Sequence, residues 1–343
     1  MTKEQEQQHD LARLALLKIG LQDYKNSVGK RLLETKQIFG QKVVAVDPHT
    51  HSIFSDGCGT IKENLLVGKA CGLDFVFITD HSGITQKRGL KNQPNASWGQ
   101  EPGSQIHHIC MLQNPKKIIL KGNNLATDFK YASENSELAF IPHPGGLFQP
   151  PESIDERLNL LRTLGKSFTM EVMNGLYKVF GSNQACDEAS IIILDQLLSA
   201  GRKINVLGSS DAHEPFGIGT VWSGVIDAEC EASSIIKTIK KDCCFASESS
   251  LLDFSCNKQS MGSTIQAKKG SLLKFKCRVA DSFGLDSVRI ISKGKIVKQE
   301  QVYGEKLYEG EFSLKSPAKS TYYRLETTAK DDRRAFSTPI YIN

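Results

Sequence analysis

The sequence lacks the features that mark several large classes of protein. Its nine cysteines include no Cys-x-x-Cys pair, and several lie in apolar runs. This pattern argues against a cysteine metal site or a disulfide framework and is typical of free, reduced thiols in a cytoplasmic protein. No stretch approaches the roughly 18 uninterrupted apolar residues of a membrane-spanning helix, so no membrane partner is expected. The N-terminal stretch MTKEQEQQHDLARLALLKIG has no basic start, apolar run or small-residue cleavage site, and no secretory signal is expected.

Charge and glycine patterns exclude further classes. The net charge of +5 is mild, and the lysines and arginines are spread along the chain. This balance favours an anionic substrate, but it predicts no dedicated nucleic-acid surface. Neither a Gly-x-Gly-x-x-Gly nor a Walker pattern precedes a predicted helix, so we expect no nucleotide cofactor and no P-loop. The absence of a Gly-x-Ser-x-Gly pattern argues against a serine nucleophile.

Hydrophobic patterning divides the chain into three zones. Residues 1–41 predict a polar, amphipathic helical segment without visible chemistry. In residues 42–250 short apolar strands alternate with amphipathic helices, one of which carries a predicted capping box, Thr60 with Glu63. This alternation predicts an α/β fold with a largely parallel sheet or barrel, and with polar residues at the carboxyl ends of the strands. Residues 251–343 hold short alternating strands, which predict an antiparallel β-sandwich domain.

The histidines gather in the middle zone. Seven of the eight lie between His49 and His213. They belong to short polar clusters at predicted strand ends: DPHTHS, SDG, ITDHSG, WGQEPGSQIHHICML, IPHPGG and GSSDAH. Each cluster alone has a simple explanation as a turn or a helix cap. Two imidazoles one residue apart on a strand, however, point the same way, and burying them together costs desolvation unless a metal binds them. Six clusters of His, Asp and Glu without cysteine therefore predict a metal site.

The order of these motifs resembles a known superfamily. The series H-x-H-S-x-x-S-D-G, I-T-D-H, G-x-E, H-P and S-D-x-H is similar to that of PHP (polymerase and histidinol phosphatase) proteins over residues 42–250. The resemblance implies a distorted (β/α)7 barrel, here with a helical segment before it and a β-sandwich after it. It also implies two to three divalent metal ions, for which imidazole and carboxylate ligands suit Zn, Mn or Fe. The ending STYYRLETT…AFSTPIYIN is similar to the tails of carbaryl-hydrolase-like PHP proteins.

The same resemblance implies the residues of the site. Nine positions match metal ligands: His49, His51, Asp56, His81, Glu101, His108, His143, Asp211 and His213. Glu101 falls at the carboxylate that bridges metals, and Asp80 is expected to orient a ligand. His108 is favoured over the adjacent His107, which would then face substrate or solvent. A rival match in the stretch KGNNLAT would put Asn124 at the bridging position and leave it without a carboxylate.

The expected activity is hydrolysis at this metal site. The resemblance implies a phosphoesterase acting on a small phosphomonoester, a nucleotide or a short oligonucleotide. Two metals about 3.5–4 Å apart can share a hydroxide near neutral pH, which would attack phosphorus. His213 and Asp56 are candidates for protonating the leaving oxygen if they are not committed to metals.

Other interpretations stay open at this point. Arg88 and Lys178 are candidates for binding an anionic substrate, and for each the alternative is a solvated surface charge. The same metals would also serve an ester, amide or carbamate hydrolase, which the tail resemblance favours. A catalytically idle PHP scaffold used for binding is the third alternative. The sequence makes no prediction of the oligomeric state.

Overall fold

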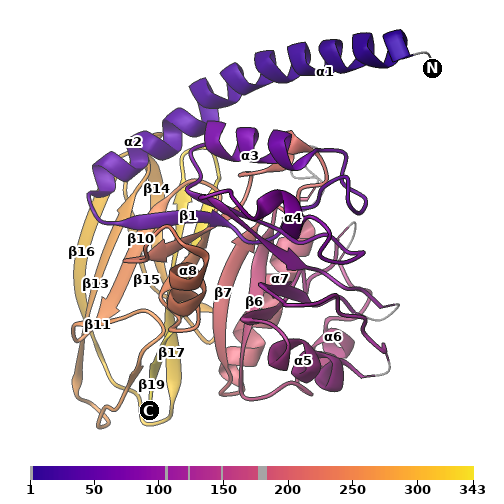
Figure 1. Ribbon diagram of the computed structural model, residues 1–343. Coiled ribbons are helices and arrows are strands. Elements are labelled where there is room, and N and C mark those ends of the chain that lie inside the picture. Colours follow the sequence, from indigo (N-terminus) through magenta and orange to yellow (C-terminus); the bar gives the residue numbers. More distant parts are fainter. Residues whose placement is uncertain (1–2, 105–106, 123, 148–149, 177–183) are drawn as a thin grey trace.

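The computed structural model describes residues 3–104, 107–122, 124–147, 150–176 and 184–343. The chain begins with a long helix, α1 (Lys3–Tyr24), which continues through a π-helical turn (Lys25–Gly29) into α2 (Lys30–Phe39). Figure 1 shows α1 extending away from the body of the molecule, while α2 lies across the C-terminal β region. Leu32 and Phe39 on α2 are buried, so this helix is part of the core. No described helix is long and apolar enough to cross a membrane.

Seven strands of the middle zone lie side by side in sequence order. They are β1 (Val43–Asp47), β2 (Phe75–Ile78), β3 (Ala96–Gln100), β4 (Cys110–Leu112), β5 (Leu138–Ile141), β6 (Ser167–Asn174) and β7 (Lys203–Ser209). The first three are parallel, as are the last three, but β4 runs antiparallel to both of its neighbours. A parallel return needs a crossover of about a dozen residues or more. The short link 101–109 between β3 and β4 is too short for that, so the strand reverses.

Helices flank these strands, as the alternating pattern predicted. They are α3 (Ile61–Ala70), α4 (Lys87–Leu90), α5 (Leu125–Glu134), α6 (Ile154–Leu161), α7 (Gln184–Ser199), the 3-10 helix Pro215–Gly217 and α8 (Ala232–Ile239). The capping box predicted at the start of α3 is present. The Thr60 hydroxyl accepts from the Glu63 backbone N–H at 3.2 Å, and the Glu63 carboxylate accepts from the Thr60 N–H at 2.8 Å. These bonds satisfy backbone donors that a helix start leaves free.

The ring of strands implied by the family resemblance does not close through regular ladders in the described part of the chain. The outer edge of β1 pairs antiparallel with β8 (Trp222–Ile226), which pairs with β9 (Cys244–Ser247). Between the first and seventh strands there is one isolated parallel bridge, which joins Thr50 to Ala212 just beyond the strand ends. The architecture is therefore mixed α/β with one large sheet, and the (β/α)7 barrel stays a prediction.

The C-terminal zone contributes strands to two sheets. A 4-stranded antiparallel sheet has the order β11 (Gln259–Ser260), β10 (Leu251–Cys256), β13 (Leu272–Ala280), β16 (Leu307–Lys315). The large sheet takes in β12 (Thr264–Ile265), β14 (Leu285–Ser292), β15 (Lys295–Gln301), β17 (Thr321–Ala329), β18 (Arg334–Ser337) and β19 (Ile340–Ile342). As predicted, pairing among these strands is antiparallel, with the exception of the short β12–β19 pair.

Packing and hydrogen bonding both cross the boundary predicted at residue 250. The ring centres of Phe275 on β13 and Tyr323 on β17 are 4.9 Å apart, so the two C-terminal sheets pack face to face. Strand β18 pairs with β9, which makes the large sheet continuous from the middle zone into the C-terminal zone. The largest apolar cluster contains Phe39, Ala45 and Phe275, one from each zone. The three zones therefore share a core.

Candidate metal centre

The predicted ligands converge at one edge of the middle strands. His49 and His51 follow β1, His81 follows β2, and Glu101 comes directly after β3. His143 follows β5, while Asp211 and His213 follow β7. Since β4 is reversed, its start lies at the same edge, and His108 sits just before that start. The structure thus brings together all nine residues that the resemblance implied.

Two of these residues hold an uncommon backbone conformation. His143 has φ of 30° and Asp211 has φ of 49°, in or near the left-handed region that side chains other than glycine rarely adopt. Such strain persists where surrounding contacts fix the chain, and it concentrates at functional sites. The His143 backbone N–H donates to the Glu171 carboxylate at 2.8 Å, and the Asp211 N–H donates to the His49 carbonyl. These bonds hold both side chains toward the centre.

The side chains form three donor groups. Within each group, the ligand atoms all lie within 4.8 Å of one another. The first group is His49, His51, Glu101 and Asp211. The second is His81, Glu101 and His108. The third is His51, Asp56, His81 and His213.

Glu101 lies at the middle of the arrangement with both carboxylate oxygens in use. Its Oε1 lies 3.0 Å from Nδ1 of His108 and 2.9 Å from Nε2 of His143. Its Oε2 lies 3.1 Å from Nε2 of His49 and 3.3 Å from Nε2 of His51. The side chain is 1% exposed. One buried carboxylate therefore faces two separate pairs of imidazoles, which is the geometry expected of a bridging ligand.

In the third group, the carboxylate of Asp56 lies between two imidazoles, as that of Glu101 does in the other two groups. Its Oδ2 lies 3.2 Å from Nε2 of His213 and 3.4 Å from Nε2 of His81. Asp56 is 53% exposed and the two imidazoles are 24% and 27% exposed. Three of the four residues of the third group are therefore open to solvent, whereas its fourth member, His51, and His49 of the first group are fully buried.

Hydrogen bonds at the far nitrogens orient several imidazoles. His81 Nδ1 donates to the Glu101 carbonyl at 2.7 Å, and His213 Nδ1 donates to the Asp211 carbonyl at 2.9 Å. His49 Nδ1 lies 2.9 Å from the Glu171 carboxylate. Each contact fixes the tautomer and leaves Nε2 free to bind a cation, as in carboxylate–histidine–metal triads.

Burial and charge act against each other in this centre. Burial alone would lower the pKa of His51, but Asp211 and Glu101 outweigh it and raise the pKa to about 9. Likewise burial lowers the pKa of His49, and the carboxylates of Asp211 and Glu101 raise it well above its ordinary value. Burial would raise the pKa of Glu101, but the His49 charge and hydrogen bonds from His108 and His143 hold it well below the usual range. The centre therefore concentrates negative charge that only cations, protons or metal ions, can balance.

The donor set fits divalent metals. It consists of imidazole nitrogens and carboxylate oxygens without thiolate, the combination suited to Zn, Mn and Fe. His51 Nδ1 is buried and has no hydrogen-bond partner among the described residues, and the nearest oxygen of Asp56 lies 3.7 Å away. A buried polar atom without a partner is costly; with a cation bound at Nε2, Nδ1 would carry the ring proton on the side of the Asp56 carboxylate.

Asp80 acts through the loop that joins two ligands. Its carboxylate accepts hydrogen bonds from the Ser52 N–H at 2.7 Å, the Ser52 hydroxyl at 2.8 Å and the Ser55 hydroxyl at 2.8 Å. These bonds fasten the turn between His51 and Asp56. Asp80 thus holds the loop that carries His51 and Asp56, through bonds to the two serines between them.

The sequence left two choices of ligand open, His107 or His108 and Glu101 or Asn124, and the structure separates the members of each pair. His107 turns away from the cluster, where its Nε2 lies 3.1 Å from the Asp128 carboxylate, and His108 enters the cluster. The Asn124 side chain accepts from the Thr127 N–H at 3.1 Å and caps α5. It belongs to none of the three donor groups found among the described residues.

The two predicted substrate-binding residues lie apart from this centre or outside the description. Arg88 is an exposed residue of α4 and lines a separate pocket. Lys178 lies outside the described residues. Among the described residues, no hydrogen bond or ion pair joins Arg88 to the donor groups.

Sequence reasoning missed Glu171 and Asp47. Glu171 is buried in β6, where it meets His49 and the His143 backbone and accepts a short hydrogen bond from the Ser209 hydroxyl. Asp47 ends β1 and accepts from the Ser210 N–H at 3.0 Å; burial raises its pKa to about 7. The available signal was an acid inside or at the end of an otherwise apolar strand, FTMEVMN and KVVAVD.

Comparisons with known proteins find only distant similarity. No protein-family model matches the sequence, and no curated protein matches it. A solved two-domain protein from Bacteroides vulgatus is described as containing a predicted PHP-like metal-dependent phosphoesterase, the superfamily that the motifs resemble. It is 16% identical with a TM-score of 0.48, and the match covers 88% of this chain and 96% of that chain.

Two further solved structures match a smaller part of the chain. Fibronectin(III)-like modules of CbhA from Clostridium thermocellum are 21% identical with a TM-score of 0.20, over 27% of this chain and 93% of theirs. The CARDB domain of a Pyrococcus furiosus protein is 13% identical with a TM-score of 0.21, over 27% of this chain and 87% of that one. Support for a function therefore comes from the side chains of the centre.

Proposed function

We propose that this protein is a metal-dependent hydrolase of the PHP type, and that it cleaves phosphate esters with three divalent ions. The observation that carries the proposal is the arrangement of three adjoining donor groups, two of which share the buried carboxylate of Glu101. The motif order supports the same conclusion independently, because it resembles PHP proteins at all nine clustered positions. A distorted (β/α)7 barrel and a cytoplasmic location belong to the same proposal.

His51, His81 and Glu101 each belong to two donor groups. If each donor atom binds one ion, these residues can be divided among three sites. His51 directs Nε2 toward Asp211 and Glu101, at 3.1 and 3.3 Å, so we assign it to a first site with those residues and His49. His81 donates through Nδ1 to a carbonyl, so its Nε2 belongs to the Asp56 site.

The remaining donors complete the other two sites. Glu101 Oε1, His108 and His143 make a second site, and Asp56, His81 and His213 make a third. The first and second sites share Glu101, and the third does not use it. We therefore expect three ions, the upper value implied by the sequence.

Bound divalent ions would supply a nucleophilic hydroxide at neutral pH and would stabilise the charge that develops on phosphorus oxygens. The chain's own residues hold the donors in place and define the open side of the site. The exposed fractions of Asp56 (53%) and His81 (27%) in the third group, and of His108 (30%) in the second, support an open side at these residues as the substrate entrance. Because Asp56 and His213 both belong to the third donor group, we assign neither as the proton donor.

The first experiment is to measure the metal content of the purified protein by plasma mass spectrometry, without chelator or affinity nickel. We expect about three equivalents of Mn, Fe or Zn per chain. Less than about a tenth of an equivalent after reconstitution would overturn the proposal in favour of a scaffold that only binds.

A substrate panel then separates the possible bonds. Small phosphomonoesters, nucleotides and short oligonucleotides are compared with carboxyl, amide and carbamate esters on the metal-loaded protein. Turnover of phosphate esters alone supports the proposal. Turnover confined to carboxyl or carbamate esters would refute phosphoesterase activity while leaving the metal centre intact.

A further inference from the structure

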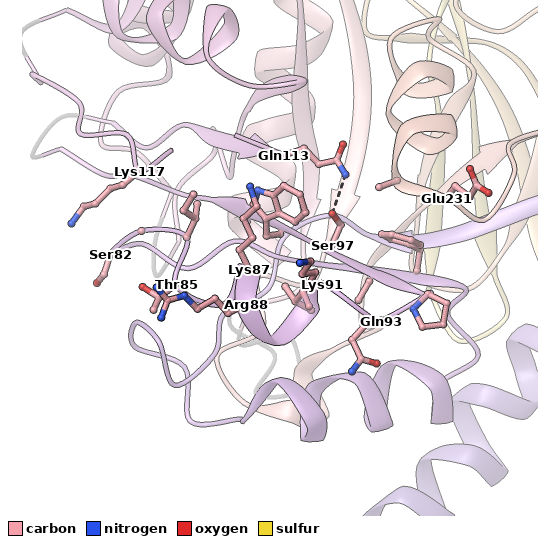
Figure 2. Close-up of a pocket in the computed structure, with 18 residues that line it drawn as sticks. Ser82, Thr85, Lys87, Arg88, Lys91, Gln93, Ser97, Gln113, Lys117 and Glu231 are labelled. Carbon is pink, nitrogen blue, oxygen red and sulfur yellow. Dashed lines mark hydrogen bonds between the residues drawn. The ribbon is translucent and has the colours of Figure 1, made fainter. Parts of the chain in front are cut away.

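A pocket lies beside the metal centre and is lined by different residues. Its volume is about 990 Å³, and it is bordered by α4, β3 and the start of α8 (Figure 2). Its lining includes Ser82 and Gly83, which directly follow His81, but none of the nine clustered residues. Its size is within the range of small-molecule sites, about 300–1,000 Å³. The pocket is therefore a separate site close to the metal centre.

The charges around this pocket are predominantly positive. Four cationic side chains line it, namely Lys87, Arg88, Lys91 and Lys117, against one carboxylate, Glu231. Figure 2 shows Glu231 at the opposite side of the view from Lys117. In the described part of the chain, none of the four cations is ion-paired with a carboxylate.

This arrangement is unfavourable without a counter-ion. Lys87 and Lys91 are four residues apart along one helical turn, a spacing at which like charges repel. Several half-buried or buried arginines elsewhere do have acidic partners, as Arg31 has Asp281 and Arg324 has Asp195. The unpaired cations around α4 thus favour an anionic ligand.

The pocket also contains a flat aromatic wall. Trp98 is half-buried, and its indole N–H donates to the Asn114 carbonyl at 3.0 Å, which fixes the ring. Lys87 Nζ lies 4.1 Å from the centre of that ring, a cation–π contact. Next to it Gln113 donates to the Ser97 hydroxyl at 3.1 Å, and Figure 2 shows this amide–hydroxyl pair at the pocket. A fixed ring with polar groups beside it suits a planar heterocycle, because aromatic rings stack and edge groups form hydrogen bonds.

We propose that this pocket binds an organic phosphate that carries a planar ring, with the nucleoside monophosphates as its simplest members. The ring lies against Trp98, and the phosphate lies among the side chains of Lys87, Arg88 and Lys91. The site is independent of the metal centre: it needs neither the metal ions nor their reaction.

The tryptophan content of the protein offers a direct readout. Trp98 is one of two tryptophans, and the other, Trp222, is 2% exposed. The full-length protein is titrated with the phosphonate analogue of AMP, whose P–C bond is not hydrolysed, both as purified and after chelator treatment. We expect a saturable change in tryptophan emission with the same midpoint in both samples. Adenosine alone and inorganic phosphate alone should each bind at least about tenfold more weakly, since each lacks one half of the interaction.

Two double variants, each of which removes two positive charges, test whether the ligand binds in this pocket. Arg88→Ala with Lys91→Ala removes two exposed cations of the pocket and should weaken binding at least about tenfold. Lys268→Ala with Lys269→Ala removes two exposed lysines of the C-terminal zone and should leave the midpoint unchanged. Trp98→Phe should remove most of the fluorescence response while calorimetry still detects binding.

Three outcomes would overturn the proposal. They are the absence of saturable binding of the phosphonate, an equal loss of affinity in both double variants, and binding confined to the metal-containing sample. The last result would assign the ligand to the metal centre and leave the proposed hydrolase function standing. Conversely, a protein that holds no metal but binds the phosphonate would refute the hydrolase and keep this site.

Discussion

The substitution Glu101→Gln tests the centre most sharply, because it keeps the shape of the side chain and removes one negative charge. Both oxygens of Glu101 lie 2.9–3.3 Å from imidazole nitrogens that face the first and second proposed sites. A charge about 4 Å from a unit charge contributes about 4 kcal/mol at an effective dielectric constant near 20. For each of those two sites, the dissociation constant should rise by roughly a thousandfold or more.

The expected readout is a change in stoichiometry. The third donor group does not include Glu101, so the variant should retain about one ion of three after dialysis against metal-free buffer. Asp56→Asn is the matched control, since it removes an acid from the third group only and should leave about two ions. Plasma mass spectrometry measures both, with circular dichroism to confirm folding.

Two results would refute this reasoning. If Glu101→Gln retained as many ions as the parent protein, the bridging position would be wrong. If it lost all three, the third group would not be an independent site, and the division of His81 and His51 among the sites would fail.

Further predictions follow from neighbouring contacts. His108→Gln should lower metal content by about one equivalent, whereas His107→Gln, which alters the pair with Asp128, should keep the metal content and change only the melting temperature. Glu171→Gln should weaken metal binding by roughly 10–100-fold, because it removes the partner that orients His49; unchanged affinity in a calorimetric titration would contradict that role. Because the pKa of His51 is about 9 without metal, loading near pH 7.5 should release protons, and affinity should rise about tenfold per pH unit for each displaced proton up to pH 9. In the metal-free protein the raised His51 pKa stabilises the fold fully below pH 6.5, and this stabilisation is lost as the pH rises to about 9, so its melting temperature should fall over that range. Titration calorimetry in two buffers of different ionisation enthalpy detects the released protons, and a flat melting temperature from pH 6.5 to 9 would contradict the sign.

Local features of the centre could be predicted because they depend on short stretches of sequence. Strand periodicity and the residues that follow each strand placed His49, His81 and His143 at strand ends before any tertiary contact was known. The capping pair of Thr60 and Glu63 is local in the same way. The reversal of β4 was missed because direction depends on the length of the connection, which the motif pattern does not weigh.

Contacts between distant strands lay beyond this reasoning. Glu171 contacts a histidine 122 residues away, so its role depends on how the fold brings β6 near the segment that follows β1. The continuity of the large sheet from β9 into β18 likewise requires two segments almost ninety residues apart. Such pairings follow from the complete fold, and the change in sequence texture near residue 250 gave no sign of them.

The pairing of β9 with β18 bears on how the protein can be divided for laboratory work. A fragment that ends near residue 250 would leave one edge of β9 without its partner strand, and the Cys244 carbonyl would lose the bond that it accepts from the Thr338 N–H. An open strand edge of this kind recruits other chains, and the fragment would also expose the apolar side chains that the C-terminal strands cover. Expression of residues 42–250 alone should therefore give an aggregating product, and inactivity of that fragment would say nothing about the chemistry of the centre.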